Sequence, residues 1–147
     1  MKRPVLLAVD ARASTYSALL TALAEAGERA GWLELGAPGV TPPESLEEAA
    51  VAGTLRAVAV GGQRVTTVKP IRGPAVLDDL LREHFRGCRL VLVRGGEGPD
   101  VEGLVRLEAD GDGWRLAPPS GRMVRRSTPE LLASLGRPSF WRDLGSG

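Results

Sequence analysis

Hydrophobic positions fall into short continuous runs that alternate with segments of helical periodicity. The run Val5–Val9 stops at Asp10 and predicts a strand that is buried on both faces. A polar loop follows, and Ser14 in this loop is placed to cap the next helix. Apolar residues then recur with the i, i+3, i+4, i+7 spacing of an amphipathic helix, at Tyr16, Leu19, Leu20 and Leu23. A strand, a loop and a helix amino terminus in this order are typical of anion sites in α/β proteins.

The remaining chain continues the alternation of strands and helices. Apolar runs predict strands at 32–35, 55–60, 65–68, 90–93, 104–108 and 114–116. Helical patterns extend from Pro43 to about Ala52 and from Gly73 to Phe85. The segment 110–113 is Asp-Gly-Asp-Gly, which predicts a hairpin turn. A capping box beginning at Ser127 predicts a final short helix. Phe140 and Trp141 are too apolar for a free tail and are expected to dock on the protein or on another subunit.

This order of elements predicts an α/β fold. We expect three layers, with a mostly parallel sheet, helices on both of its faces and an antiparallel hairpin at its edge. The runs at 5–9, 55–60 and 90–93 are expected at the centre of the sheet. The sequence contains no internal repeat and no linker. Residues 1–147 are therefore expected to form a single domain.

Composition narrows the classes of partner. The formal net charge is +1, so attraction to bulk phosphate predicts no nucleic-acid partner. No run of about 18 apolar residues and no signal peptide is present, which predicts no membrane partner. Cys88 is the only cysteine and cannot form an internal disulfide. We therefore expect a cytoplasmic protein.

The loop after the first strand matches a phosphate-binding loop only in part. Asp10, Thr15, Tyr16 and Ser17 stand at the four fixed positions of the pattern G-x-x-x-x-G-K-[ST], and only Ser17 agrees. Tyr16 replaces the lysine that reaches the phosphates, and Asp10 would repel them. Replacing Asp10 by Gly and Tyr16 by Lys is predicted to restore charge and loop geometry together.

The order of elements, with the segment RLVLVRGG at 89–96, resembles the MobB family, the P-loop adapter proteins of molybdopterin guanine dinucleotide synthesis. The resemblance covers roughly residues 4–108 and implies a P-loop fold with an adapter role in molybdenum cofactor biosynthesis. Arg94 stands where the family's strand-end glutamate would help to hold magnesium. GAPGVTPP at 36–43 replaces the family's histidine-rich segment. These departures imply that the chain does not hydrolyse nucleoside triphosphates, and no catalytic residue or metal ligand is assigned.

Three other interpretations remain open. The segment VLLAVDARAS is similar to the opening of universal stress proteins, in which an aspartate at this strand end contacts adenine nucleotide. The later segment RGGEG at 94–98 lies too early for the phosphate segment of those proteins. Alternatively, the chain is an enzyme that acts on a small phosphorylated substrate through Asp10 with Lys69. It is also compatible with a structural interaction module whose old site is a relic.

The candidate ligand-binding residues share a predicted position near the crevice at the strand ends. They are Asp10, Ser14, Thr15, Tyr16, Ser17, Lys69, Arg72 and Arg94. No cofactor is assigned with certainty; the expected occupant is GTP, another anionic small molecule or a loop of a protein partner. A second copy of the chain, forming a homodimer, is one candidate partner. Plainer interpretations are a turn aspartate at Asp10 and a solvated loop around Lys69. His84 and Cys88 are interpreted as packing residues.

Overall fold

The computed structural model describes residues 3–35, 44–71 and 73–146. Its contacts divide the chain into two compact units, which are described separately below. The first unit holds Met1–Ala37 and Leu80–Gly147, and the second holds Pro38–Asp79. The expectation that residues 1–147 form a single domain stays a prediction.

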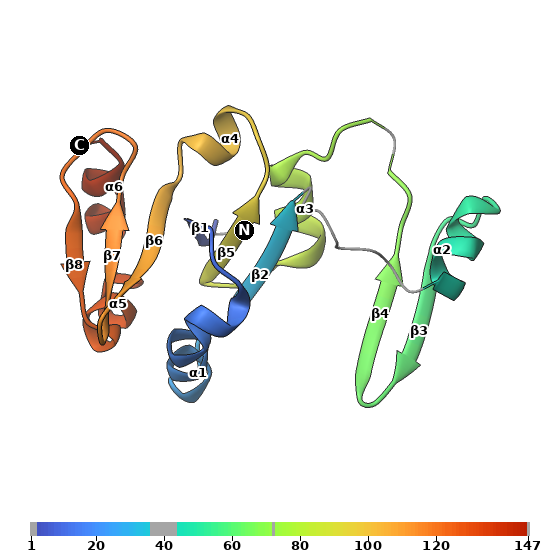
Figure 1. Cartoon of the computed structure of the whole chain (residues 1–147), viewed down its shortest axis with the longest axis horizontal. Helices are drawn as coiled ribbons and strands as arrows, with labels where there is room; N and C mark the ends of the chain where they lie inside the picture. Colours follow the sequence, from blue (N-terminus) through green and yellow to red (C-terminus); the bar gives the residue numbers. More distant parts are fainter. Residues whose placement is uncertain (1–2, 36–43, 72, 147) are drawn as a thin grey trace. The chain divides into compact units, whose positions relative to one another are not determined.

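Strands and helices alternate along the first part of the chain, apart from the pair β3 and β4, whereas the last part has three successive strands followed by two helices (Figure 1). In the first unit they are β1 (Val5–Val9), the 3-10 helix η1 (Ala13–Tyr16), α1 (Ser17–Glu25), β2 (Ala30–Leu35), β5 (Leu90–Gly95), α4 (Pro99–Glu102), β6 (Val105–Asp110), β7 (Gly113–Ala117), β8 (Val124–Arg126), α5 (Thr128–Ser134) and α6 (Pro138–Ser146). The second unit contains α2 (Glu44–Val51), β3 (Ala57–Gly61) and β4 (Arg64–Val68), and α3 (Leu77–His84) runs across the division. None of the helices in the described residues is long and apolar enough to cross a membrane.

The first unit is built on a six-stranded sheet with the order β2-β5-β1-β6-β7-β8. The first four strands in this order run parallel, whereas β7 and β8 are antiparallel to their neighbours. The hairpin β6–β7 turns at the Asp-Gly-Asp-Gly segment, as predicted. The predicted α/β class, with a mostly parallel sheet and an antiparallel hairpin at its edge, is therefore confirmed.

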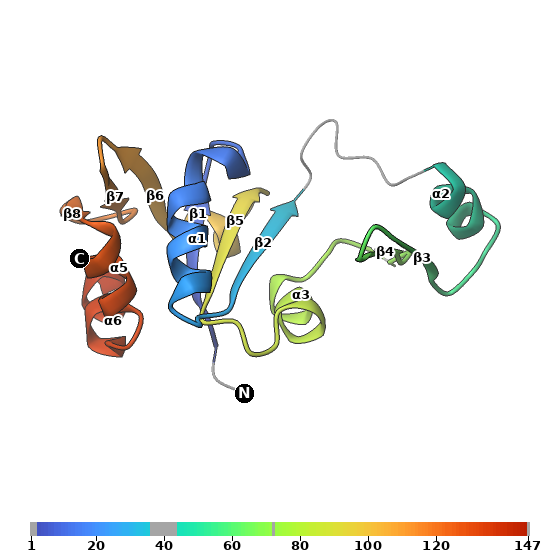
Figure 2. The same cartoon turned by 90° about the horizontal axis from the view of Figure 1, so that it is seen from below.

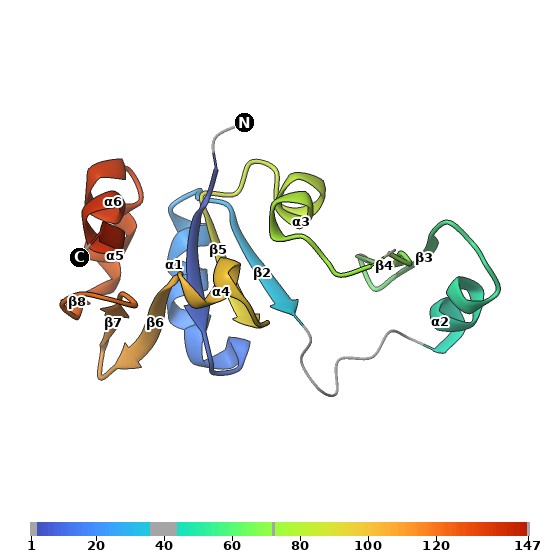
Figure 3. The same ribbon diagram turned by 90° about the horizontal axis from the view of Figure 1, so that it is seen from above.

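Two crossovers leave the centre of the sheet in opposite directions. The chain passes from β1 over β5 to reach β2, and from β5 over β1 to reach β6. Because parallel crossovers are almost always right-handed, opposite directions place their helices on opposite faces of the sheet. Figure 3 shows this arrangement, with α1 and α4 on either side of the sheet. The carboxyl ends of β1 and β5 therefore border the crevice in which α/β proteins commonly bind ligands.

One face of the sheet carries the main hydrophobic core. Leu7 and Leu92 on the central strands are fully buried against Leu19 and Leu23 of α1. The same core contains Leu131 of α5, Leu135 directly after it and Leu144 of α6, and Figure 2 shows α5 and α6 as two adjacent helices. Burial of one leucine side chain contributes about 1.5–3 kcal/mol to stability. Phe140 and Trp141 pack against this core, which confirms that the end of the chain docks on the protein.

The strand expected at 55–60 does not belong to the six-stranded sheet, so that prediction was wrong. In the structure β3 pairs antiparallel with β4 in a separate two-stranded sheet, with Val58 opposite Thr67. The turn between them places Gly62 at φ 58° and Gln63 at φ 62°, the two positive φ values of a type I′ hairpin turn. This turn brings the two runs together locally, and Val60 remains 77% exposed.

The predicted start of one helix is confirmed, and the predicted starts of two others are not. Ser127 and Glu130 form the predicted capping box, with each backbone N–H bonded to the other side chain. The prediction that Ser14 caps a helix was wrong, because η1 already begins at Ala13 and neither η1 nor α1 has a side-chain cap. Helix α3 begins at Leu77 instead of Gly73.

One further expectation fails in the second half of the chain, and one helix there was not expected. His84 is exposed and is not a packing residue. The helix α6 was not predicted, since its apolar residues were interpreted only as a docked tail. Cys88, in contrast, is partly buried just before β5, in keeping with its interpretation as a packing residue.

Candidate functional site

Four charged side chains meet near the carboxyl ends of β1, β2 and β5, and the fourth of them, Arg106, reaches this place from the start of β6, opposite Ala8. Asp10 follows β1, Glu34 lies in β2, Arg94 in β5 and Arg106 in β6. The strand register explains this proximity, because Glu34 and Val9 both stand opposite Arg94. We call these four residues the strand-end cluster.

Both arginines of the strand-end cluster form ion pairs with carboxylates of the same cluster. Arg94 lies 3.3 Å from a carboxylate oxygen of Glu34 and donates a second bond to the backbone oxygen of Asp10 at 3.3 Å. Arg106 forms an ion pair with the carboxylate of Asp10. The cluster therefore contains two guanidinium groups and two carboxylates that are paired with each other. A free anion arriving here would have to compete with these internal carboxylates.

Glu34 is held by two neighbours. The indole N–H of Trp32 donates to its carboxylate at 3.0 Å, and Arg94 contacts the same oxygen. The bond from Trp32, followed by the bond and charge of Arg94, lowers the pKa of the Glu34 carboxyl below its ordinary value. Glu34 is thus ionised near neutral pH and keeps Arg94 in place.

Two backbone N–H groups of the loop after β1 are hydrogen-bonded within the loop itself. Thr15 donates its N–H to the carbonyl oxygen of Arg12 at 2.9 Å, and Ser17 donates its N–H to the carbonyl oxygen of Ser14. In a phosphate-binding loop such N–H groups point at the ligand. Ser14, Thr15 and Ser17 are themselves exposed, so their hydroxyl groups lie at the protein surface. Their role as ligand contacts stays a prediction.

Tyr16 lies in the core and not at the surface of the loop. Its side chain is 2% exposed, and its hydroxyl donates a hydrogen bond to the backbone oxygen of Leu107 at 3.2 Å. The ring stacks on Trp114 at 5.8 Å and meets Trp32 at the same centroid distance with a tilt of 48°. The position that a lysine occupies in a P-loop is therefore filled by a core residue.

The other predicted site residues fall outside the strand-end cluster. Lys69 is exposed and follows β4 in the second unit, so its pairing with Asp10 stays a prediction. Arg72 lies outside the described residues. The described residues contain no group of three or more His, Cys, Asp or Glu side chains in an arrangement that could hold a metal ion.

Sequence reasoning missed Glu34 and Arg106. Glu34 is the only charged residue of β2, and this is the signal that could have found it, whereas Arg106 lies in a strand that also holds Glu108 and Asp110 and so gives no such signal. A charge within such a strand requires a partner, and the carboxyl ends of parallel strands lie at one edge of the sheet. Which of the other charges would meet them depends on the strand order.

Comparison with known proteins finds likeness among solved structures but not among sequences. No family model matches the chain, and no curated protein sequence matches it. Among solved structures, the crystal structure of Bacillus subtilis MobB is similar. The alignment covers 65% of this chain and 63% of that chain, at 17% sequence identity and a TM-score of 0.47. The chain thus spans less than two thirds of the structure it matches, and the proposals below rest on its own residues.

Proposed function

We propose that this protein is a non-catalytic binding protein derived from a P-loop fold, and that it acts as an adapter in the biosynthesis of molybdopterin guanine dinucleotide. The observation that carries the proposal is the burial of Tyr16, whose hydroxyl is bonded to Leu107. The pathway follows from the resemblance of residues 4–108 to the P-loop adapters of that synthesis.

Hydrolysis of a nucleoside triphosphate requires a cation at the phosphates and a bound metal ion. In this chain the phenol of Tyr16 is enclosed in the core, and Arg94 lies where the family's metal-side glutamate would stand. Arg94 also forms an ion pair with Glu34. The strand-end cluster therefore supports binding without hydrolysis.

The paired charges of the strand-end cluster favour a protein partner over a small free anion. Asp10 keeps its carboxylate 77% exposed while Arg106 pairs with it. The exposed hydroxyl groups of Ser14, Thr15 and Ser17 lie beside it along the chain. A partner loop with both donors and acceptors would complement this mixed surface better than a phosphate group would.

The first experiment tests the absence of catalysis. GTP and ATP hydrolysis are measured with Mg²⁺ on stringently repurified protein and on the variant Ser17→Ala. We expect both proteins to match the background rate. Turnover that survives repurification and disappears in Ser17→Ala would overturn the non-catalytic assignment.

The second experiment tests the partner. Calorimetric titration is carried out with the guanylyl-transferring enzyme of the same pathway and the same organism. The variant Ser14→Arg places a bulky charge on the loop, and Thr21→Arg places the same side chain at an exposed position further along α1. We expect Ser14→Arg to weaken binding about tenfold or more and Thr21→Arg to leave it unchanged. Absence of binding by the parent protein, or equal effects of both variants, would overturn the adapter role.

Thermal unfolding with nucleotides separates the alternatives. The universal-stress-protein interpretation predicts a rise in Tm with ATP or AMP, since a ligand of the native state must stabilise it. The enzyme interpretation through Asp10 predicts turnover of a small phosphorylated substrate that Asp10→Asn abolishes. Under our proposal neither change occurs.

A further inference from the structure

A cavity of about 560 Å³ lies at the opposite edge of the six-stranded sheet, where the parallel strands begin. It borders Val5 at the start of β1, Arg89 just before β5 and Leu104 just before β6. The α5–α6 region closes another side through Leu135 and Trp141. We call this space the amino-edge cavity, and all of its lining residues belong to the first unit.

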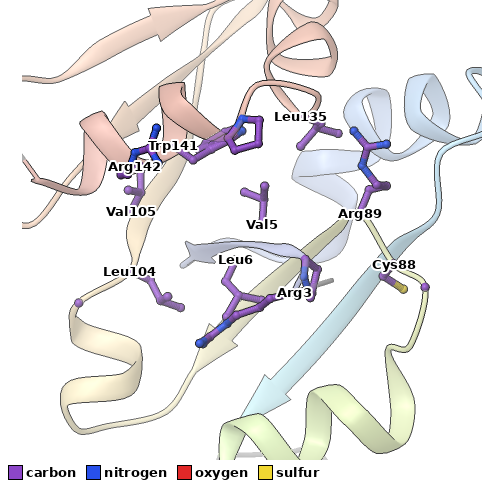
Figure 4. A pocket seen from close by; sticks show the side chains of 14 residues that line it. Arg3, Val5, Leu6, Cys88, Arg89, Leu104, Val105, Leu135, Trp141 and Arg142 are labelled. Atoms are coloured by element: carbon purple, nitrogen blue, oxygen red, sulfur yellow. The ribbon is translucent and has the colours of Figure 1, made fainter. Parts of the chain in front are cut away.

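The lining combines apolar walls with positive charge. Val5, Leu104, Leu135 and Trp141 provide aliphatic and aromatic surface. Arg3, Arg89 and Arg142 also border the cavity, and they come from three separate segments. No carboxylate side chain is among the lining residues. Figure 4 shows Trp141 and Arg142 on the α6 side, with Arg89 and Cys88 on the opposite side and Val5 between them.

The walls of the amino-edge cavity are fixed by hydrogen bonds. The indole N–H of Trp141 donates to the backbone oxygen of Ser134 at 2.7 Å, which sets the plane of its ring. The backbone N–H of Val5 donates to the carbonyl oxygen of Arg89 at 2.9 Å and ties the starts of β1 and β5 together. Arg89 also forms an ion pair with Glu28 at 3.7 Å. The cavity is therefore largely preformed, as small-molecule sites usually are.

We propose that the amino-edge cavity binds a small amphipathic anion, with a planar aromatic body and a carboxylate, sulfonate or phosphate group. Its volume lies within the range of small-ligand pockets. The flat indole of Trp141 offers a surface on which a planar ring can pack. Guanidinium groups bind planar oxyanions through paired N–H donors, which favours the anionic head at the arginine-bearing margin. This inference is independent of the proposed adapter function.

Binding is tested with the fluorescent probe anilinonaphthalene sulfonate, which combines a planar aromatic body with a sulfonate. We expect saturable binding at about one site per chain that weakens as ionic strength rises. Naphthoate is expected to displace the probe at lower concentration than octanoate, because only naphthoate is planar. Equal displacement by both would overturn the planar-ligand part of the proposal.

Matched variants locate the site. Arg142→Gln removes one cavity cation and is expected to weaken probe binding about tenfold. Arg137→Gln removes an exposed arginine that does not line the cavity, and is expected to have no effect. Leu104→Trp is expected to fill the space and abolish binding without loss of the folded state in circular dichroism.

The probe also binds exposed apolar surfaces, so Val58→Ser with Val60→Ser on β3 serves as the second control. Loss of binding in that control or in Arg137→Gln would overturn the assignment to the cavity.

Cys88 provides an independent readout, because it is the only cysteine and lines the cavity. Naphthoate is expected to slow the reaction of Cys88 with a thiol reagent in the parent protein. The protection should disappear in Leu104→Trp. An unchanged reaction rate at a saturating naphthoate concentration would show that the ligand binds elsewhere.

Discussion

The hydroxyl of Tyr16 donates a hydrogen bond to the backbone oxygen of Leu107 at 3.2 Å, joining η1 to β6 through the core. These residues are separated by 91 positions in the sequence. The same ring stacks on Trp114 in β7. The loop at the end of β1 is therefore anchored to the antiparallel edge of the sheet, and its conformation depends on this contact.

Removal of the hydroxyl should reduce stability. In Tyr16→Phe the ring still fills its place, but the bond to Leu107 is lost, so we expect a loss of about 1 kcal/mol in the free energy of unfolding. Urea denaturation measures the change. Thr21→Ala, which removes an exposed hydroxyl group, is expected to change stability by less than about 0.5 kcal/mol. Equal stability of Tyr16→Phe and the parent would show that the bond contributes nothing.

A lysine at position 16 should destabilise the protein instead of restoring a phosphate site. The side chain would enter a position that is 2% exposed, where an unpaired ammonium costs about 3–5 kcal/mol. The sequence-based expectation that Asp10→Gly with Tyr16→Lys restores anion binding assumed an exposed side chain. Thermal unfolding of Tyr16→Lys measures the cost, and Ser17→Lys at an exposed neighbour is the control. A folded Tyr16→Lys protein of unchanged Tm that binds GTP would contradict this.

Stability should fall at alkaline pH because of Tyr16. Burial raises the pKa of its phenol above the ordinary value of 10.0. The unfolded chain therefore releases this proton first, and the native state holds it more tightly. The contribution is fully present below pH 10.0 and is lost as pH rises through the folded pKa.

Denaturation across this range, with Tyr16→Phe as control, should show a steeper loss of stability in the parent protein. Parallel slopes would contradict the assignment. Since Tyr16 is the only tyrosine, tyrosinate absorbance follows its titration directly.

Gly95 is required by both backbone conformation and space. Its φ is 78°, and a Cβ at this position would lie 2.3 Å from the backbone oxygen of Leu35. Gly98 has a φ of 96° but nothing within 4 Å of such a Cβ. We expect Gly98→Ala to cost about 1–2 kcal/mol from backbone strain, and Gly95→Ala to cost clearly more because β2 must move. Chemical denaturation of the two variants gives the difference, and equal losses would contradict the steric argument.

Short-range patterns were enough to predict several elements. The run Val5–Val9, the hairpin turn at 110–113 and the capping box at Ser127 all formed where the sequence predicts them. Each depends on residues within a few positions of one another, through apolar periodicity, turn conformation or side-chain capping. The α/β class follows from the order of these elements.

The same short-range chemistry explains the main error in the fold. The apolar run near 57–60 has the composition of a central strand, yet it pairs with 64–68 through the turn at Gly62 and Gln63. A central place in the large sheet and the hairpin with 64–68 would both pair the backbone N–H and C=O groups of this run. Which partner a strand takes is decided by the turn geometry and by the competing strands, and a single run of residues does not contain that information.

The sequence by itself determined that β1 would end at Asp10 and that Tyr16 would not supply the charge of a P-loop lysine. Only the tertiary structure decided that Tyr16 belongs to the core and that Arg94 pairs with Glu34, which lies 60 residues away. The order and register of the strands determine which charges meet near the carboxyl end of β1. That order is a global outcome of packing the whole sheet, so the strand-end cluster became visible only in the folded chain.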